Sequence, residues 1–268
     1  MTIPTGPRTN SLYHASELAA GSVFSSARAV AILLASFGGF VVVAAVLGQV
    51  DLVVTVIAGE AMLVLIPVAF TLSARGGPAM LGLRRPETRF VIAALLIGSS
   101  QWFLNLVAVE ALDSWIGISK EGIDRLQKVA TQPSLAVSLI AIAVMPAIGE
   151  EILFRGVLAR GLASRFVPAV SIVASAVVFS AFHMSLIQAA PTLLLGLVYG
   201  YLALNARSAI PTMIAHLLNN SFAILVAQGA VPWLANALGY NTVLSAGIAA
   251  SLTTTGLVLA TRRGEVRP

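Results

Sequence analysis

Residues 149–156 read Gly-Glu-Glu-Ile-Leu-Phe-Arg-Gly and place two adjacent carboxylates and an arginine inside an apolar stretch from about residue 134 to 163. A charged side chain at the centre of a bilayer costs about 2.5–3.5 kcal/mol on insertion scales. An apolar sequence keeps such groups only where they are paired or where a function needs them. We therefore interpret the rest of the chain as a helical bundle built around this stretch.

The composition indicates an integral membrane protein. Of the 268 residues, 58% are hydrophobic and 10% are charged, whereas a soluble domain carries about 25% charged residues. The net charge of +5 does not indicate nucleic-acid binding, because the basic residues are scattered among short loops. The chain has no cysteine, which excludes disulfides, thiolate metal sites and a cysteine nucleophile.

The hydropathy pattern predicts an all-α fold, a polytopic transmembrane bundle of about eight spanning helices. The expected spans are 29–47, 52–72, 90–112, 134–163, 167–183, 191–204, 211–227 and 243–260. Pro146 is expected to kink the fourth helix.

The chain divides into four parts by composition. They are a polar tail (1–28), a three-helix part with an interfacial amphipathic segment at its end (29–133, with 113–133 as that segment), a core (134–227), and the last helix with a basic tail (228–268). No segment between the apolar runs is long enough to fold alone.

The distribution of basic residues supports this count of helices. With eight spans and an inner N-terminus, only Lys120, Arg125 and Lys128 fall in outer segments, whereas the inner segments hold Arg8, Arg28, Arg75, Arg84, Arg85, Arg89, Arg160, Arg165, Arg207, Arg262, Arg263 and Arg267. Cytoplasmic loops are enriched in Lys and Arg. We therefore expect both termini to be cytoplasmic.

Strongly polar side chains recur within the spans that follow the third helix. They are Glu150, Glu151, Arg155, His183, His216, Asn219 and Asn220. The i,i+4 spacing places Glu151 with Arg155, and His216 with Asn220, on shared helix faces. Glu150 is turned about 100° from Glu151 and can point elsewhere. Three helices can thus present polar groups to one point in the bundle.

These residue types suit the activation of water. A buried glutamate can act as a general base, and a histidine can orient the water. A histidine and an amide on one helix face can donate hydrogen bonds to a developing oxyanion. Peptide-bond hydrolysis needs these parts and no covalent nucleophile. The chain lacks the runs Gly-x-Ser-Gly and Gly-x-Gly-Asp, which argues against serine and aspartyl intramembrane proteases.

Three motifs carry a resemblance to a known family. Glu150-Glu151-x-x-x-Arg155, Phe179-x-x-x-His183 and His216-x-x-x-Asn220, in this order on separate helices, resemble the motifs of the CAAX-protease and bacteriocin-processing family (CPBP, or Abi) of intramembrane proteases. Eight helices also match its type II CAAX prenyl endopeptidases. The resemblance implies an intramembrane endopeptidase, of glutamate type or metallo type, that processes a lipidated C-terminus or a bacteriocin-like peptide.

The resemblance also implies a role for each motif residue. Glu150 would be the base that activates water, and His183 would help to hold that water. His216 and Asn220 would form the oxyanion hole. The partners implied are the lipid bilayer and a peptide or lipidated protein, with no nucleic acid, in the plasma membrane of a bacterium or archaeon.

Several of these residues also have purely structural interpretations. Glu151 and Arg155 would support the site by pairing, which also explains how two charges survive in a bundle without any activity. Phe179 would pack beneath the site. Asn219 would pack or cap a helix. Glu60, alone in the second span, would support catalysis, pair with Arg155 or lie near an interface.

A cofactor is not implied by the residues alone. Glu150, His183 and His216 are ligand types that zinc accepts, and three ligands would leave a fourth position for water. The His-Glu-x-x-His motif of common zinc proteases is absent. Zinc therefore stays a candidate beside a metal-free glutamate mechanism.

Two other classes of function fit a polar cluster in a membrane bundle. A non-enzymatic scaffold or bacteriocin-immunity protein would use the cluster for structure only. A proton-coupled transporter would use the carboxylates and histidines as a relay, but it would favour inverted repeats, which the sequence does not show.

One geometric difficulty concerns depth in the membrane. In straight helices, Glu150 would lie about ten residues, or roughly 15 Å, from the inner end of its span, and His183 about sixteen residues, or roughly 24 Å. The two side chains would then not meet. Tilt, the kink at Pro146 or a different helix boundary must remove this difference.

Overall fold

The computed structural model describes residues 22–116, 127–128 and 130–261. The terminal tails, His14 and most of the predicted interfacial segment 113–133 lie outside the described residues. The described elements are all helical: α2 Ser26–Leu47, α3 Leu52–Ser73, η1 Pro78–Leu81, α4 Thr88–Ile116, α6 Leu135–Ser138, η2 Leu139–Val144, α7 Met145–Glu150, η3 Glu151–Ala159, α8 Arg160–Ala163, α9 Pro168–Phe182, α10 Leu186–Ala206, α11 Ile210–Ala227, α12 Pro232–Tyr240 and α13 Thr242–Leu259.

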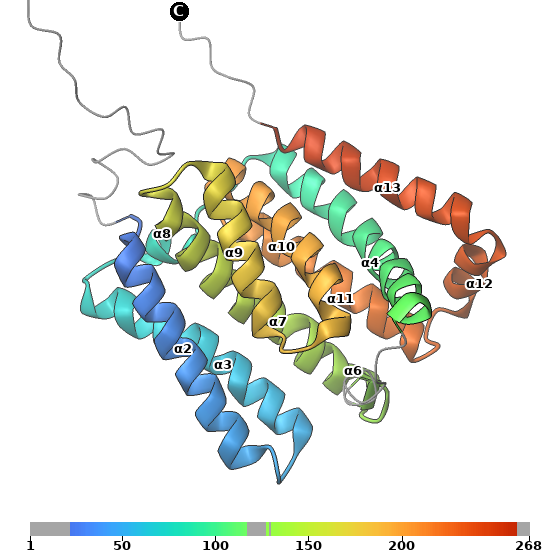
Figure 1. Ribbon diagram of the computed structural model, residues 1–268, viewed down its shortest axis with the longest axis horizontal. Coiled ribbons are helices and arrows are strands. Elements are labelled where there is room, and N and C mark those ends of the chain that lie inside the picture. Colours follow the sequence, from blue (N-terminus) through green and yellow to red (C-terminus); the bar gives the residue numbers. More distant parts are fainter. Residues whose placement is uncertain (1–21, 117–126, 129, 262–268) are drawn as a thin grey trace, which may run out of the picture.

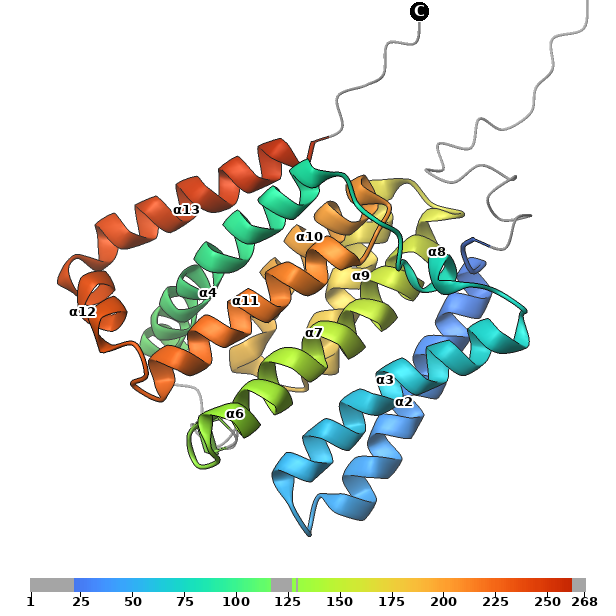
Figure 2. The ribbon, with the colours of Figure 1, turned by 180° about the vertical axis from the view of Figure 1, so that it is seen from behind.

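The helices form three groups side by side (Figure 1). The hairpin of α2 and α3 lies on one flank, and α4 with α13 lies on the other. Between them pack α9, α10, α11 and the continuous helical run Leu135–Ala163, in which η2 and η3 are π-helical turns. The opposite view shows α11 and α7 running alongside each other in the middle of the bundle (Figure 2).

The all-α, multi-pass architecture confirms the fold predicted from hydropathy. Within the described residues, seven helices are long and apolar enough to cross a membrane, with the run Leu135–Ala163 taken as one. The fifth predicted span, 167–183, corresponds to α9, which is apolar but has only 15 residues, or about 22 Å at 1.5 Å per residue. This length is less than the roughly 30 Å hydrocarbon core of a bilayer.

The arginine-bearing turns lie at one end of the bundle. Arg160 donates to the carbonyls of Ala79 at 2.8 Å and Ser22 at 3.1 Å, and Arg89 donates to the carbonyl of Thr261 at 3.1 Å. These bonds join segments that are far apart in sequence.

Two helix boundaries differ from those expected. α10 begins at Leu186, five residues before Pro191, because Ser185 in an extended conformation starts the helix and Pro191 is accommodated within it. α12, which was not predicted, begins with Pro232 at its first turn. Its Trp233 and Tyr240 side chains are exposed, which suits a position at a membrane–water interface.

The approach of α4 to α11 depends on Gly98. A Cβ atom at this position would lie 2.5 Å from the carbonyl oxygen and 2.7 Å from the Cα of Ala215. Ala215 precedes His216, so this contact sets the position of a residue that the sequence assigned to the site. The absence of a side chain at Gly98 is therefore a packing requirement.

We predict that Gly98→Ala lowers the stability of the protein in detergent. Overpacking against backbone atoms costs about 1–3 kcal/mol, so the unfolding temperature should fall. Gly247→Ala in α13 is the matched control, because nothing lies within 4 Å of a Cβ there. The Gly247→Ala variant should be as stable as the wild-type protein or more stable, because alanine favours the helix by about 1 kcal/mol over glycine. Equal unfolding temperatures of the two variants would contradict the prediction.

Candidate active site

The run Leu135–Ala163 carries the two adjacent glutamates. Glu150 ends α7 and Glu151 begins the π-helical segment η3. π-Helical turns within α-helices are frequent at functional sites. The Glu150 residue is 5% exposed and Glu151 is fully buried, so both carboxyl groups lie inside the bundle.

Glu151 is the centre of a buried ion-pair network. Its Oε1 accepts from Arg155 Nη1 at 2.8 Å and lies 2.8 Å from His216 Nδ1. The guanidinium carbon of Arg155 lies 4.1 Å from the ring centroid of Phe179 and 5.4 Å from that of Tyr199. Glu151 thus ties the helix of Arg155 to α11, and two aromatic rings flank the arginine.

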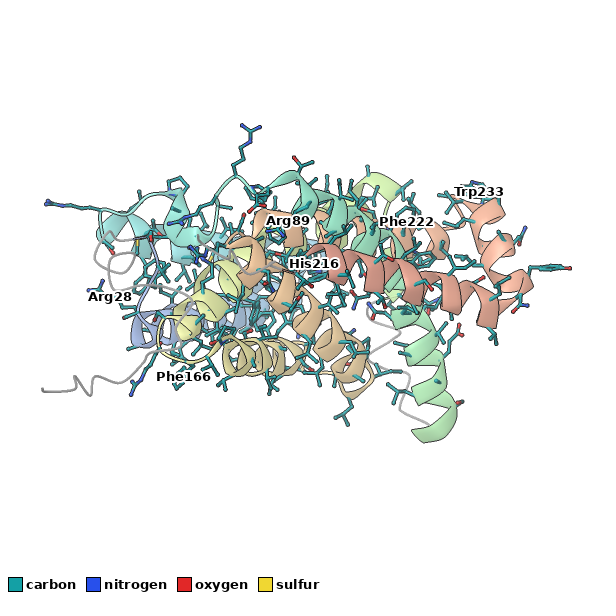
Figure 3. The ribbon with its side chains drawn as sticks, turned by 90° about the horizontal axis from the view of Figure 1, so that it is seen from above. Arg28, Arg89, Phe166, His216, Phe222 and Trp233 are labelled. Carbon is teal, nitrogen blue, oxygen red and sulfur yellow. The ribbon has the colours of Figure 1, made fainter. Side chains whose placement is uncertain are left out.

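Glu150 faces the two histidines. Its Oε2 lies 3.8 Å from His216 Nε2, and its Oε1 lies 4.0 Å from His183 Nε2. These separations exceed a direct hydrogen bond and suit a contact through one water molecule. Figure 3 shows His216 in the middle of the molecule, well away from peripheral residues such as Trp233.

The other ring nitrogen of each histidine has an acceptor beside it. Nδ1 of His183 lies 3.0 Å from the carbonyl oxygen of Phe179, and Nδ1 of His216 lies beside the Glu151 carboxylate. Carbonyl and carboxylate oxygens only accept, so both Nδ1 atoms must carry hydrogen. Each Nε2 therefore remains available toward Glu150.

The depth difference expected for straight helices disappears in the structure. The inner helical run continues to Ala163, so Glu150 lies thirteen residues from its end, or about 20 Å. His183 follows the last residue of α9 and lies fifteen residues from Pro168, or about 22 Å. The expected span already ended at residue 163, so the count of about ten residues was too small, and this error created part of the difference.

Asn220 lies on the same face of α11 as His216. Its Nδ2 donates to the carbonyl oxygen of Ile142 at 2.7 Å, and its Oδ1 accepts from Asn219 Nδ2 at 2.9 Å. Asn220 is half-buried, and the His183 side chain is 20% exposed. The site is therefore accessible at these two residues, while Glu151 and Arg155 lie behind them.

Three further residues border the site without belonging to its motifs. Glu60 on α3 is 5% exposed, and its Oε2, which has no hydrogen-bond partner among the described residues, would lie 2.8 Å from a Cβ atom on Gly149. Tyr199 is fully buried, with its ring centroid 5.7 Å from that of His216. Asn219 is buried beside Asn220. Burial shows that the Glu60 side chain faces the protein interior.

A zinc ion at this site would need several protein ligands around one point. Among the described residues, no group of three or more His, Cys, Asp or Glu side chains is placed to hold a metal ion. The Glu150 oxygens lie 3.8 and 4.0 Å from the Nε2 atoms of His216 and His183, somewhat more than the roughly 3.4 Å between two ligands of a tetrahedral zinc ion. Glu150, His183 and His216 are ligand types that zinc accepts, but they do not form a metal-binding group in this conformation.

Most of the predicted site residues meet at one place in the bundle. Glu150 and His216 are buried and face each other, His183 borders them on an accessible side, and Glu151, Arg155 and Phe179 lie behind. Asn220 lies one turn along α11 from His216 and bonds to Ile142 and Asn219. From the sequence, Asn219 was expected only to pack or cap a helix, and Tyr199 was not named as a candidate. The only sequence signal for Asn219 was its position next to Asn220.

Comparison with known families assigns the segment that holds this site. Residues 132–222 match the family model described as type II CAAX prenyl endopeptidase Rce1-like. No curated protein and no solved structure matched the chain. The matched segment contains every motif residue named above. Over this segment, a third of its length, the chain is similar to the type II CAAX prenyl endopeptidases, and its described helices are those of a multi-pass membrane protein.

Proposed function

We propose that the protein is an intramembrane endopeptidase in which Glu150 activates water. The observation that carries the proposal is the position of Glu150, whose two oxygens each face the Nε2 atom of a different histidine at 3.8 and 4.0 Å. A water molecule about 2.8 Å from a carboxylate oxygen and from one Nε2 bridges such a gap.

In the proposed hydrolysis, Glu150 takes one proton from water and later returns it. The water oxygen attacks the carbonyl carbon of the scissile peptide as its proton passes to the Glu150 carboxylate. The carbonyl π electrons move to the oxygen, which becomes an oxyanion. When the intermediate collapses, the C–N bond breaks and Glu150 returns the proton to the leaving amine. No covalent bond to the protein forms at any step.

In this proposal His216 and Asn220 stabilise the oxyanion. With hydrogen on both ring nitrogens, His216 keeps its Nδ1–H on Glu151 and offers Nε2–H to the substrate, in the way that a carboxylate supports an imidazolium in hydrolase triads. The Glu150 and Glu151 carboxylates are then opposed by Arg155 and an imidazolium at His216, which lowers the cost of burying these charges.

The substrate class follows from the family. Type II CAAX prenyl endopeptidases, as their name states, act on prenylated CAAX sequences, so we propose a lipidated C-terminal peptide as the substrate. A bilayer-embedded site suits a substrate whose lipid anchor holds the scissile bond close to the membrane. An unlipidated peptide of the same sequence should therefore be cut less efficiently, mainly through a higher KM.

The experiment uses purified protein in liposomes with a fluorogenic prenylated C-terminal peptide and its unlipidated counterpart. We expect cleavage of the prenylated peptide that persists after treatment with a chelator, because in this proposal the Glu150 carboxylate takes the proton of water directly. Loss of activity with chelator and its recovery with added zinc would overturn the metal-free mechanism. A lower KM for the unlipidated peptide would overturn the proposed substrate class.

A further inference from the structure

Pro146 changes the hydrogen bonding of the helix that carries the site. In an α-helix, the N–H of each residue donates to the carbonyl four residues earlier, but proline has no N–H. The carbonyl of Ile142 therefore cannot receive an α-helical bond from residue 146. It lies in the π-helical segment η2, which ends at Val144, two residues before the proline. Asn220 Nδ2 donates to this carbonyl at 2.7 Å, from another helix.

The Ile142 carbonyl also sets the direction of a chain of three amides. A carbonyl can only accept, so the Asn220 group facing it must be the NH₂. Asn220 Oδ1 is then turned to Asn219, whose Nδ2 donates to it at 2.9 Å. Asn219 Oδ1 accepts in turn from Asn105 Nδ2 on α4, at 3.4 Å.

The reversed orientation of Asn220 is unfavourable at both ends. It would place the amide oxygen against the Ile142 oxygen and the amide nitrogen against the Asn219 nitrogen, each a pair of like groups. Asn219 is 5% exposed, and an unsatisfied buried polar group costs about 1–3 kcal/mol. The Asn220 amide is thus held in one orientation from two sides.

We propose that Pro146 and Asn219 are positioning residues that fix the Asn220 amide for oxyanion binding. Pro146 frees the Ile142 carbonyl that takes one N–H of Asn220, and Asn219 holds its oxygen. The second N–H of Asn220 then has a set direction on the helix face that it shares with His216. The oxyanion role of Asn220 in this inference rests on the proposed function, whereas the fixed orientation does not.

The fixed orientation can be measured without any substrate. In protein labelled with ¹⁵N-asparagine in detergent, the side-chain NH₂ of Asn220 should exchange slowly with solvent. Pro146→Ala supplies a helical N–H that competes for the Ile142 carbonyl, and Asn219→Ala removes the donor to the amide oxygen. Each change should raise the exchange rate about threefold to tenfold, as for the loss of one hydrogen bond. Unchanged exchange in both variants would overturn the proposal.

Kinetics test the consequence for catalysis. With the prenylated peptide, Asn219→Ala and Pro146→Ala should each lower kcat by roughly tenfold at nearly constant KM, less than the 10²–10³ expected for Asn220→Ala, which removes the donor itself. Asn219→Ala should have no additional effect in the Asn220→Ala background, because its action passes through Asn220. If the losses of kcat from Asn219→Ala and Asn220→Ala added up in the double variant, the positioning role of Asn219 would be overturned.

Stability separates positioning from a general folding defect. Pro146→Ala should leave the unfolding temperature unchanged or higher, since proline disfavours helix interiors, while kcat falls. Asn205→Ala, which removes an amide that donates within α10, should keep wild-type kcat. If wild-type protein cleaves no peptide while the exchange rates change as expected, the proposed function fails and the fixed orientation of Asn220 stands.

Discussion

Glu150→Gln is expected to lower kcat by about 10²–10⁴-fold, the usual contribution of a general base. Glutamine has nearly the same shape and fits the same buried position, but it cannot take a proton from water. Its effect on KM should be small, because Glu150 acts on the water and not on substrate binding. Initial rates with the fluorogenic prenylated peptide in liposomes measure both parameters.

Glu110→Gln is the matched control for this change. Glu110 lies on α4 and borders an apolar cavity of about 160 Å³ lined by Trp102, Leu238 and their neighbours. The Glu110→Gln substitution makes the same chemical change at a position away from the histidines, so this variant is expected to keep the wild-type kcat. An equal loss in both variants would show that the effect comes from folding and not from proton transfer.

Arg155→Met is expected to destabilise the protein by about 3–5 kcal/mol, because it leaves the buried Glu151 carboxylate without its cation. Arg155 is 1% exposed, so water cannot replace the lost partner. The unfolding temperature in detergent should fall by many degrees. Arg28→Met, at an exposed position near the start of α2, should change the stability by no more than about 0.5 kcal/mol.

The double variant Glu151→Gln/Arg155→Met separates stability from catalysis. It removes both charges of the pair, and replacing a buried ion pair with neutral side chains of similar volume is often neutral for stability. Most of the lost stability should return. Activity should stay low, because a neutral amide accepts from His216 Nδ1 but does not stabilise an imidazolium. Full recovery of kcat would contradict the proposed role of Glu151.

Much of the fold could be predicted because a bilayer constrains sequence strongly. Each span needs a long apolar run, and the loops carry a charge bias, so the order and approximate limits of the helices were readable. The differences occur where these constraints are weak. α12 is short and lies between spans, and Pro191 lies inside α10 because a proline near a helix start does not always mark the start.

The site was predictable in its residues but not in its contacts. Helical spacing places Glu151 beside Arg155, but only the packing of α11 against η3 brings His216 to the same carboxylate. Asn220 donates to the Ile142 carbonyl, which lacks its α-helical donor because residue 146 is a proline, and a kink predicted from sequence does not locate this bond. Glu60 reaches Gly149 from α3, a contact between distant segments.

The most direct test of the central claim is product analysis by mass spectrometry. Wild-type protein in liposomes is incubated with the prenylated peptide, in parallel with Glu150→Gln protein of matched folded amount. Water activation by Glu150 predicts two fragments whose masses sum to the substrate plus one water in the wild-type reaction, and intact substrate with the variant. The same fragments formed at the same rate by Glu150→Gln would contradict it.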